Sequence, residues 1–561
     1  MNRTEPRNAD ELLGAFDHRH ALQSRSATAV FALNALAPGA ILLFAYFATG
    51  IALRLFADVP LHDDWTYAWS VEQFLKTGKL QVLDWSIHYP FAQILWGALF
   101  CLPFGFSFSA LKVSTVVLAW LGSLALYGTL REVGRARTES LIASLVLIVN
   151  PVFYLLSFSF MTDVPFVSVS NIAFFFIVRG FSRRNALDLW LGCGFGVVGF
   201  FVRQLAIAIP GAVLLYVMFE PSLRSRHYLL PPLVASLLIC FTPYLIAHTM
   251  GLTSQYTARE WVLDKWLHQP ELGIPGSVRI VMHSGLALFP MTLPLMASYY
   301  RRLRFWCVLG LLLLLTGCAI LFTPEIPKPL DGMWNLVALG KERRLLLGRP
   351  GPDFLPSWLN YPLLAFALFS FAGIVIKVID GLRIDPLRLL FWYAASHFGL
   401  IMIVWLFDAW GSDRYSIVLL PPLIVLLAGP QLRSKITAAG IAVLFLVAML
   451  VTWSETQNNR AAAEGLAWLR TNGIPFSDIN AGYALDGWYL YSHPENLAPG
   501  QIPERDVPFV TTNERRSYVI ATAPLEGYKV LRNYRWSVPL RSLDFNIYVL
   551  QAVAIDATEN K

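Results

Sequence analysis

Charged residues and cysteines are scarce in this sequence of 561 residues, and their scarcity excludes several classes of protein. Only 14% of the residues are charged, whereas 56% are hydrophobic and the mean hydropathy is +0.53. A soluble core cannot bury this much apolar surface, which excludes a water-soluble globular protein. The five cysteines show no CxxC or Cys/His spacing, which argues against a zinc site and is typical of packing residues.

Internal repeats and low-complexity segments are also lacking. Many secondary transporters contain inverted repeats, so the absence of a convincing repeat weakens the interpretation of the chain as a transporter. The net charge of +7 does not indicate a nucleic-acid partner, because the lysines and arginines fall in short clusters between apolar runs. That distribution is typical of the cytoplasmic loops of a membrane protein.

Long apolar runs predict a polytopic α-helical membrane protein. Each span needs about 20 apolar residues, because lipid offers the backbone no hydrogen-bonding partner. Placing all seven basic clusters on the cytoplasmic side gives about 13 transmembrane helices, and it makes residues 89–106 a re-entrant or interfacial segment. The predicted spans are residues 30–56, 108–130, 141–157, 166–180, 188–202, 205–219, 229–249, 279–298, 305–322, 358–377, 388–407, 415–429 and 436–453.

Three regions follow from these spans. Residues 1–28 are predicted to form a cytoplasmic tail, and residues 29–454 the transmembrane domain, with large outer loops at 57–107 and 323–357. Residues 455–561 are predicted to form a small soluble α/β domain on the extracytoplasmic face. Within it, a short helix is expected at 461–470, and strands are expected at 517–522, 528–536 and 546–552.

Two acidic sites lie in segments predicted to be outside. The first is the pair Asp63 and Asp64, followed by Tyr67 in an otherwise aromatic and apolar loop. A carboxylate near a membrane surface loses hydration and becomes a stronger base for an acceptor hydroxyl, although an acidic pair can also merely solvate a loop. The second is Asp163 in a tight turn, which suggests a functional residue or a helix cap made by Thr162 or Asp163.

Basic residues also stand on the predicted outer side, where orientation rules do not explain them. A guanidinium matches phosphate oxygens and would suit an anionic lipid head or a phosphate leaving group. Lys341 and Arg343 could equally contact anionic headgroups, and His88 could be a packed side chain or a substrate ligand. The outer basic residues are Arg203, Lys328, Lys341, Arg343, Arg344, Arg349 and Arg414.

In this order, the features resemble the GT-C membrane glycosyltransferases over about residues 30–430. The resemblance is to the branch with the lipid A aminoarabinose transferase, the protein O-mannosyltransferases and the lipopolysaccharide-core sugar transferases. In that family the first outer loop carries the catalytic carboxylate, matched by Asp63 and Asp64, and a second acidic turn is matched by Asp163. Arg203 matches a basic position of the fifth-span signature, and Arg414-Tyr415 matches a late arginine-tyrosine run.

The resemblance implies a glycosyltransferase in the plasma (inner) membrane, with the N-terminus cytoplasmic. The enzyme would move a hexosyl or pentosyl group, with inversion, from a polyprenyl-phosphate-linked donor to a hydroxyl of a glycan, lipid or protein acceptor. Asp63 would be the base, and Asp64 and Asp163 would orient the acceptor or the base. Two or three carboxylates such as Asp63 and Asp163 could share Mg²⁺ or Mn²⁺, although no tight metal is expected.

The remaining candidate residues have expected roles toward the donor and the acceptor. Replacing Arg203 or Arg414 with leucine is expected to reduce the rate more than the stability. The donor-phosphate ligands would be Arg203, Arg414, Tyr415, Lys341 and Arg343, and the positioning residues would be His88, Tyr89 and Tyr67.

Two other classes of protein stay open at this point. A transporter or flippase of lipid-linked glycan would use Asp63, Asp163 and Arg203 as a charged pathway, and it predicts essential charges within the spans. A noncatalytic membrane scaffold predicts that the substitution Asp63→Asn has no effect.

Overall fold

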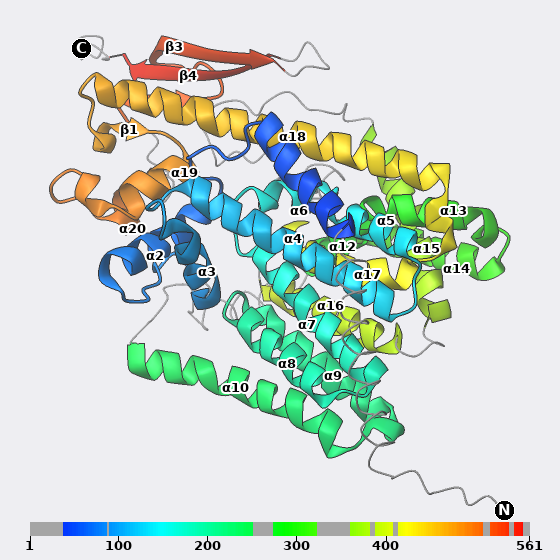
Figure 1. Ribbon diagram of the computed structural model, residues 1–561. Coiled ribbons are helices and arrows are strands. Elements are labelled where there is room, and N and C mark those ends of the chain that lie inside the picture. The colour runs from blue at the N-terminus through cyan, green and yellow to red at the C-terminus, as the bar shows by residue number, and fades with distance from the viewer. Residues whose placement is uncertain are drawn as a thin grey trace, which may run out of the picture.

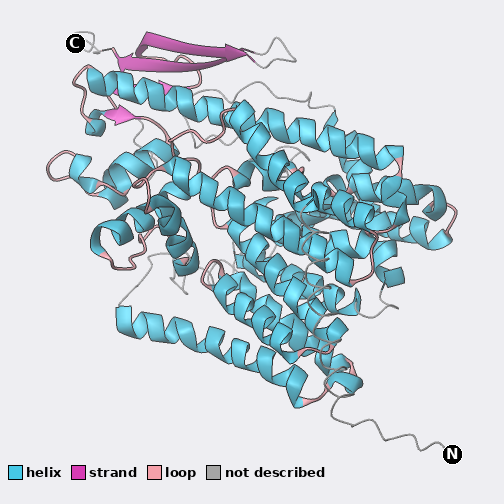
Figure 2. Cartoon of the chain, viewed as in Figure 1, coloured by secondary structure: helices cyan, strands magenta, loops and turns pink. Residues whose placement is uncertain are grey.

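Apolar helices make up most of the molecule, and a small sheet lies near its C-terminus (Figure 1). The structure is a computed structural model, and it describes residues 37–86, 89–250, 273–322, 359–381, 387–407, 413–508, 516–537 and 544–553. Figure 2 shows that strands occur only beside the C-terminal part of the described chain. The predicted class, a mostly helical fold with a small C-terminal sheet, is confirmed.

Helices follow one another closely along the whole described chain. The first half of the chain contains the helix Ala37–Ala52, α2 (Asp64–Thr77), α3 (Phe91–Cys101), α4 (Phe108–Glu132), α5 (Arg137–Ile148), α6 (Pro151–Ser157), α7 (Asp163–Arg183), α8 (Ala186–Phe200), η1 (Gln204–Ile207), α9 (Ala208–Phe219) and α10 (Arg226–Met250). The second half contains α12 (Gly273–Ala287), α13 (Phe289–Tyr299), α14 (Leu303–Phe322), α15 (Asn360–Gly381), α16 (Leu387–Phe407), η7 (Asp413–Leu419), α17 (Leu420–Leu427), α18 (Lys435–Thr471), α19 (Tyr483–Asp486), η10 (Gly487–Tyr491) and α20 (Pro503–Asp506).

Four of the described helices are long and apolar enough to cross a membrane, and a bent pair of helices could add a fifth span. Several shorter apolar helices lie beside them, so the multi-pass character is clear while the number of about 13 spans stays a prediction. Helix α3 has 11 residues, too few to cross a bilayer, which agrees with a re-entrant or interfacial segment. The long helices are α4, α7, the part Pro362–Gly381 of α15, and α18.

Prolines break two of the predicted spans. The predicted span 141–157 consists of α5 and α6, which meet at an angle of 72°. The side chain of Asn150 caps α6 by accepting the N–H of Phe153 at 3.0 Å, and Pro151 occupies the first position of that helix. Similarly, the predicted span 279–298 is divided into α12 and α13, and Pro290 lies in the first turn of α13. Proline therefore starts a new helix at each break rather than bending one continuous helix.

Ion pairs join several of the basic clusters at one end of the helices. Arg183, at the end of α7, lies 2.5 Å from Glu132 at the end of α4. Arg433, just before α18, lies 3.0 Å from Glu139 in the first turn of α5. The opposite end of α7 begins at Asp163, so the second acidic site and these basic clusters lie at opposite ends of the same helix.

Helix α18 packs against the C-terminal sheet with its C-terminal half (Figure 1). The separate helix predicted at 461–470 is wrong, because those residues continue the 37-residue helix α18. The alanine-rich run Ala461-Ala462-Ala463 favours continuation, and the helix ends only at Asn472 and Gly473. Leu466 on α18 belongs to the same buried hydrophobic cluster as Ile520 and Val549 of the sheet.

The sheet has four strands in the order β1-β2-β4-β3. The three longer strands confirm the predicted segments, whereas the two-residue β1 has no signal of its own in the sequence. Strand β1 pairs with β2 in parallel, and β4 pairs antiparallel with both β2 and β3. The strands are β1 (Ile479–Asn480), β2 (Tyr518–Ala521), β3 (Tyr528–Ser537) and β4 (Asp544–Ala552).

Candidate functional site

Two adjacent carboxylates open α2, and the structure gives them different surroundings. Asp64 is fully buried and accepts the backbone N–H of Leu61 at 2.7 Å and the N–H of Phe160 at 3.3 Å. Its carboxylate therefore joins the loop before α2 to the turn before α7. Burial raises the pKa of Asp64 to about 7, although the charge of Lys112 opposes the rise. This environment is that of a structural residue.

Lys112 fixes the same loop from the other side. Its ammonium group is buried near the start of α4 and donates to the carbonyl oxygens of Ala57 at 2.7 Å and Val59 at 2.9 Å. A buried ammonium needs hydrogen-bonding partners to offset its lost hydration, so this contact pins the loop that leads to the acidic pair.

Asp63 has a different environment, in which two side chains from distant parts of the chain meet its carboxylate. Arg414 in η7 donates to Oδ2 at 3.0 Å, and the hydroxyl of Tyr483 in α19 donates to Oδ1 at 2.5 Å. Burial alone would raise the pKa of Asp63, but the Arg414 charge and the Tyr483 hydrogen bond outweigh it and lower the pKa below its usual value. Asp63 is therefore an ionised carboxylate held from two sides. The expectation that lost hydration makes this carboxylate a stronger base is wrong for Asp63, because the arginine charge and the phenol hydrogen bond stabilise its charged form.

A second ion pair lies beside the first. Asp163, the first residue of α7, accepts from Nη1 of Arg203 at 2.6 Å, and both side chains are buried. The predicted cap is wrong in detail, because neither Thr162 nor Asp163 makes a side-chain capping bond to α7. Arg203 sits in extended conformation between α8 and η1, at the tip predicted from the divided apolar run. This second pair is dehydrated, whereas the side chains of Arg414 and Asp63 in the first pair are 19% and 29% exposed.

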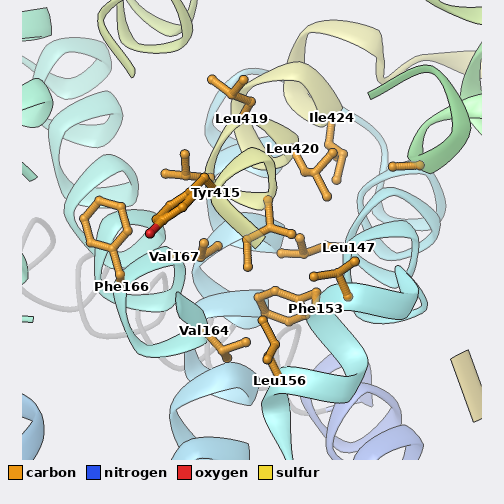
Figure 3. Packing of buried hydrophobic residues seen from close by; sticks show 14 of the residues in the cluster. Leu147, Phe153, Leu156, Val164, Phe166, Val167, Tyr415, Leu419, Leu420 and Ile424 are labelled. Atoms are coloured by element: carbon orange, nitrogen blue, oxygen red, sulfur yellow. The ribbon is translucent and has the colours of Figure 1, made fainter. Parts of the chain in front are cut away.

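The ring of Tyr415 connects the two ion pairs. The guanidinium of Arg203 lies 4.9 Å from the ring centroid, and that of Arg414 lies 5.5 Å from it. Stacking on an aromatic ring orients a guanidinium without using its N–H donors. Figure 3 shows Tyr415 among buried side chains of the core, including Phe166 and Val167 of α7. Core packing thus fixes the position of the Tyr415 ring, and the ring orients both guanidinium groups.

Two further titratable side chains face this network. Tyr67 of α2 is buried; burial raises the pKa of its hydroxyl, with Asp63 and both arginines in electrostatic range. His62 is buried as well, and burial lowers its pKa to about 4, so the imidazole is neutral. The backbone of His62 has φ 54°, a left-handed conformation that is uncommon for a residue other than glycine. Such backbone strain tends to cluster at functional sites.

The structure therefore joins most of the predicted site residues and leaves others apart. Asp63, Asp163, Arg203, Arg414 and Tyr415 form one connected network, which we call the acidic-arginine network. Tyr67 borders it, whereas Asp64 is turned to the protein backbone.

Three predicted residues lie outside the described part of the chain, namely His88, Lys341 and Arg343. Tyr89 is described. It stands just before α3, where its ring packs against that of Phe91 at 6.2 Å, and Phe91 is not a member of the acidic-arginine network.

Sequence reasoning missed Tyr483 and His62. Tyr483 lies in the region predicted to be a separate domain, more than 400 residues from Asp63, and no local motif marks it. The signal for His62 was present, since it directly precedes the acidic pair.

No group of three His, Cys, Asp or Glu side chains among the described residues is arranged to hold a metal ion. Asp63 and Asp163 each face an arginine, and two guanidinium groups beside a dication would repel it. The residues at this site therefore do not fit Mg²⁺ or Mn²⁺.

Comparison with known proteins supports the resemblance. Residues 88–246 match the family described as dolichyl-phosphate-mannose-protein mannosyltransferase. The protein O-mannosyltransferases are one branch of the GT-C glycosyltransferases, so the predicted resemblance is confirmed over that part of the chain. No curated protein matches the sequence.

Three solved structures show a weaker likeness. ArnT from Cupriavidus metallidurans in the apo state is 14% identical, with a TM-score of 0.40, and the match covers 94% of this chain and 99% of ArnT. ArnT from the same organism bound to undecaprenyl phosphate is 12% identical, with a TM-score of 0.38, and the match covers 92% of this chain and 97% of ArnT. The Archaeoglobus fulgidus oligosaccharyltransferase, tethered to an acceptor peptide, is 13% identical, with a TM-score of 0.37. That match covers 84% of this chain and 60% of the oligosaccharyltransferase chain.

Proposed function

We propose that this protein is an inverting glycosyltransferase, which transfers a sugar from a polyprenyl-phosphate-linked donor to an acceptor hydroxyl on the extracytoplasmic face of the membrane. The acidic-arginine network carries the proposal, because segments of the chain more than 300 residues apart converge on it. The match to a family described by a dolichyl-phosphate-linked sugar supports a lipid-phosphate donor. The site lies at the end of α7 opposite to the basic clusters, which supports the extracytoplasmic face.

Asp63 is the base in this proposal. Its pKa is held below the usual value, so the carboxylate is ionised at neutral pH and can accept a proton. As the acceptor oxygen bonds to the anomeric carbon, the hydroxyl proton passes to Asp63 and the bond between that carbon and the phosphate oxygen breaks. The departing group is the polyprenyl phosphate, which carries away the bonding electrons. Attack and departure on opposite faces invert the anomeric centre.

Arg203 and Arg414 stabilise the departing phosphate. Each guanidinium has a buried Nε that has no hydrogen-bond partner within the part of the chain that the structure describes. The two groups share the ring of Tyr415, which limits their motion and supports a preorganised pair of positive charges. A well-placed donor of this kind contributes about 2 to 4 kcal/mol to transition-state stabilisation.

The arrangement favours a transferase over a flippase. A flippase would use a charged pathway, with essential charges within the spans. Here Asp163 lies at the first residue of α7, and Asp63 lies in the loop before α2, so the paired charges gather at one end of the helices. We assign Asp64 a structural role, since both of its oxygens accept backbone N–H groups.

The proposal is tested with the purified protein in nanodiscs, a panel of polyprenyl-phosphate sugars and membrane extract as acceptor. We expect release of polyprenyl phosphate with one donor, and a product whose anomeric configuration is inverted relative to that donor. Retained configuration would exclude direct attack with Asp63 as base. Absence of release with every donor, together with movement of a fluorescent lipid-linked glycan across the bilayer, would favour the flippase.

A further inference from the structure

A residue of the C-terminal region, Tyr483, contacts the Asp63 carboxylate. The region is predicted from the sequence to form a domain of its own, yet a short segment of it lies on the first outer loop. That segment comprises α19 and η10, residues 483–491. It brings the hydroxyl of Tyr483 to 2.5 Å from Oδ1 of Asp63, a contact between residues 420 positions apart. In Figure 1 the α19 label stands close to those of α2 and α4.

The direction of the Tyr483 hydrogen bond is fixed by a second contact. The indole N–H of Trp85 donates to the Tyr483 oxygen at 3.0 Å. An indole nitrogen can only donate, so the phenol oxygen must accept there, and the phenol has a single proton of its own. That proton points to Asp63. The chain of donors therefore runs from Trp85 to Tyr483 to the carboxylate.

Aromatic packing holds the segment in place. The ring of Trp65, which is fully buried, lies 6.1 Å from that of Tyr483 and 5.6 Å from that of Tyr491. Trp85 also packs edge-on against Tyr491 at 5.2 Å. At Gly487 the backbone touches Trp65 so closely that a Cβ atom would lie 2.3 Å from the indole ring. This close packing of the segment against Trp65 restricts movement of the segment, so Tyr483 has a defined position.

An ion pair adds to this attachment. Nε2 of His493 lies 3.1 Å from the Glu72 carboxylate on α2, and Nδ1 lies 2.7 Å from the carbonyl oxygen of Trp488. Both neighbours are acceptors, so both ring nitrogens must carry a proton, and the imidazolium form is favoured. His493 lies two residues after the segment, so the charged pair ties the end of the segment to the helix that begins next to Asp63.

We infer that Tyr483 is a positioning residue for the base, and that the C-terminal region thereby forms part of the active site. This inference rests on the proposed function, because it takes Asp63 as the base. Arg414 holds one carboxylate oxygen and Tyr483 holds the other, so the plane of the carboxylate is fixed. A carboxylate oxygen can accept two hydrogen bonds, so Oδ1 keeps a lone pair for the acceptor hydroxyl.

The geometry also specifies how the loss of Tyr483 should act. Without the phenol, Asp63 keeps its charge partner Arg414 but loses one of two fixed contacts. The carboxylate then rotates more freely, which lowers kcat, and its pKa rises, since a hydrogen bond to the charged form has been removed. The acid limb of the pH profile should accordingly move to higher pH.

The test compares three purified variants in the transfer assay across pH, namely Tyr483→Phe, Tyr489→Phe and Asp63→Asn. Tyr489 is the matched control, because it lies in the same segment but stacks on Phe476 at 4.7 Å, away from Asp63. We expect Tyr483→Phe to lower kcat by about tenfold or more, the effect of losing a hydrogen bond to a charged group. Its acid limb should shift upward, and Tyr489→Phe should match the wild type.

The outcomes separate this inference from the proposed function. If Asp63→Asn is inactive while Tyr483→Phe keeps the wild-type kcat and acid limb, Asp63 remains the base and the role of Tyr483 is refuted. If Asp63→Asn keeps full activity, the proposed base is wrong whatever Tyr483 does. A Tyr483→Phe variant with lower kcat and an unshifted acid limb would also overturn the inference, since a merely structural defect would leave the ionisation of Asp63 unchanged.

Discussion

Removing Arg203 should destabilise the protein strongly, because it would leave Asp163 as a buried, unpaired charge. The two side chains are only 4% and 0% exposed and lie 2.6 Å apart. Loss of one partner of such a pair costs about 3 to 5 kcal/mol. If the pair breaks before the transition state for unfolding, that cost accelerates irreversible thermal inactivation by about 100-fold or more. The sequence alone predicted a larger effect on rate than on stability, and the buried pair reverses that expectation.

A double-mutant cycle measures this effect. Arg203→Leu and Asp163→Asn should each shorten the half-life of the folded protein in nanodiscs, whereas the combined variant should be less damaged than Arg203→Leu alone, because it leaves no unpaired charge. Arg302→Leu is the matched control, since the side chains of Arg302 and Asp380 are 41% and 32% exposed and their pair should contribute at most about 1 kcal/mol. Equal half-lives for Arg203→Leu and Arg302→Leu would refute the reasoning, as would strictly additive losses in the double variant.

Two further predictions concern the attachment of the C-terminal segment. Gly487→Ala should displace the segment from Trp65 and destabilise it by about 1 to 3 kcal/mol, detectable as faster limited proteolysis; wild-type resistance would contradict the close contact. Burial lowers the pKa of His493, but Glu72 and the carbonyl oxygen of Trp488 outweigh it and raise the pKa above its ordinary value. The attachment should therefore be strongest below the ordinary pKa and weaken as pH rises through the folded-state pKa. His493→Gln should abolish this dependence between about pH 5 and 8, and an equal dependence in the variant would assign it to another group.

The members of the acidic-arginine network could be singled out from the sequence, although their pairing could not, because they occupy points where the predicted spans begin or end. Asp163 and Arg203 stand at tips between apolar runs, and Arg414 precedes one. The ends of neighbouring spans on the same side of a membrane lie close together. The hydropathy pattern therefore predicts that these residues are near one another. The hydropathy pattern could not distinguish the role of Asp63 from that of Asp64. The two roles differ because the Asp64 carboxylate accepts backbone N–H groups, whereas the Asp63 carboxylate accepts a guanidinium.

The contribution of Tyr483 could not be predicted, for a different reason. The sequence after α18 changes from apolar to mixed, which is typical of a separate soluble domain. Its attachment to the first outer loop depends on packing of Trp65 and Trp85 against distant rings, and such contacts leave no periodic signal in the chain. The length of α18 was missed because the polar stretch after residue 453 resembles the end of a span, although it contains no helix breaker.

The most direct test of the central claim compares Asp63→Asn with Asp64→Asn in the polyprenyl-phosphate release assay, with thermal stability measured on the same samples. Asp63→Asn should release polyprenyl phosphate at least about 100-fold more slowly than the wild type while remaining folded, because a catalytic base is lost. Asp64→Asn should instead lower the thermal stability while the protein that remains folded retains most of its activity. Unchanged release by a folded Asp63→Asn variant would contradict the assignment of the base and, with it, the mechanism proposed for this site.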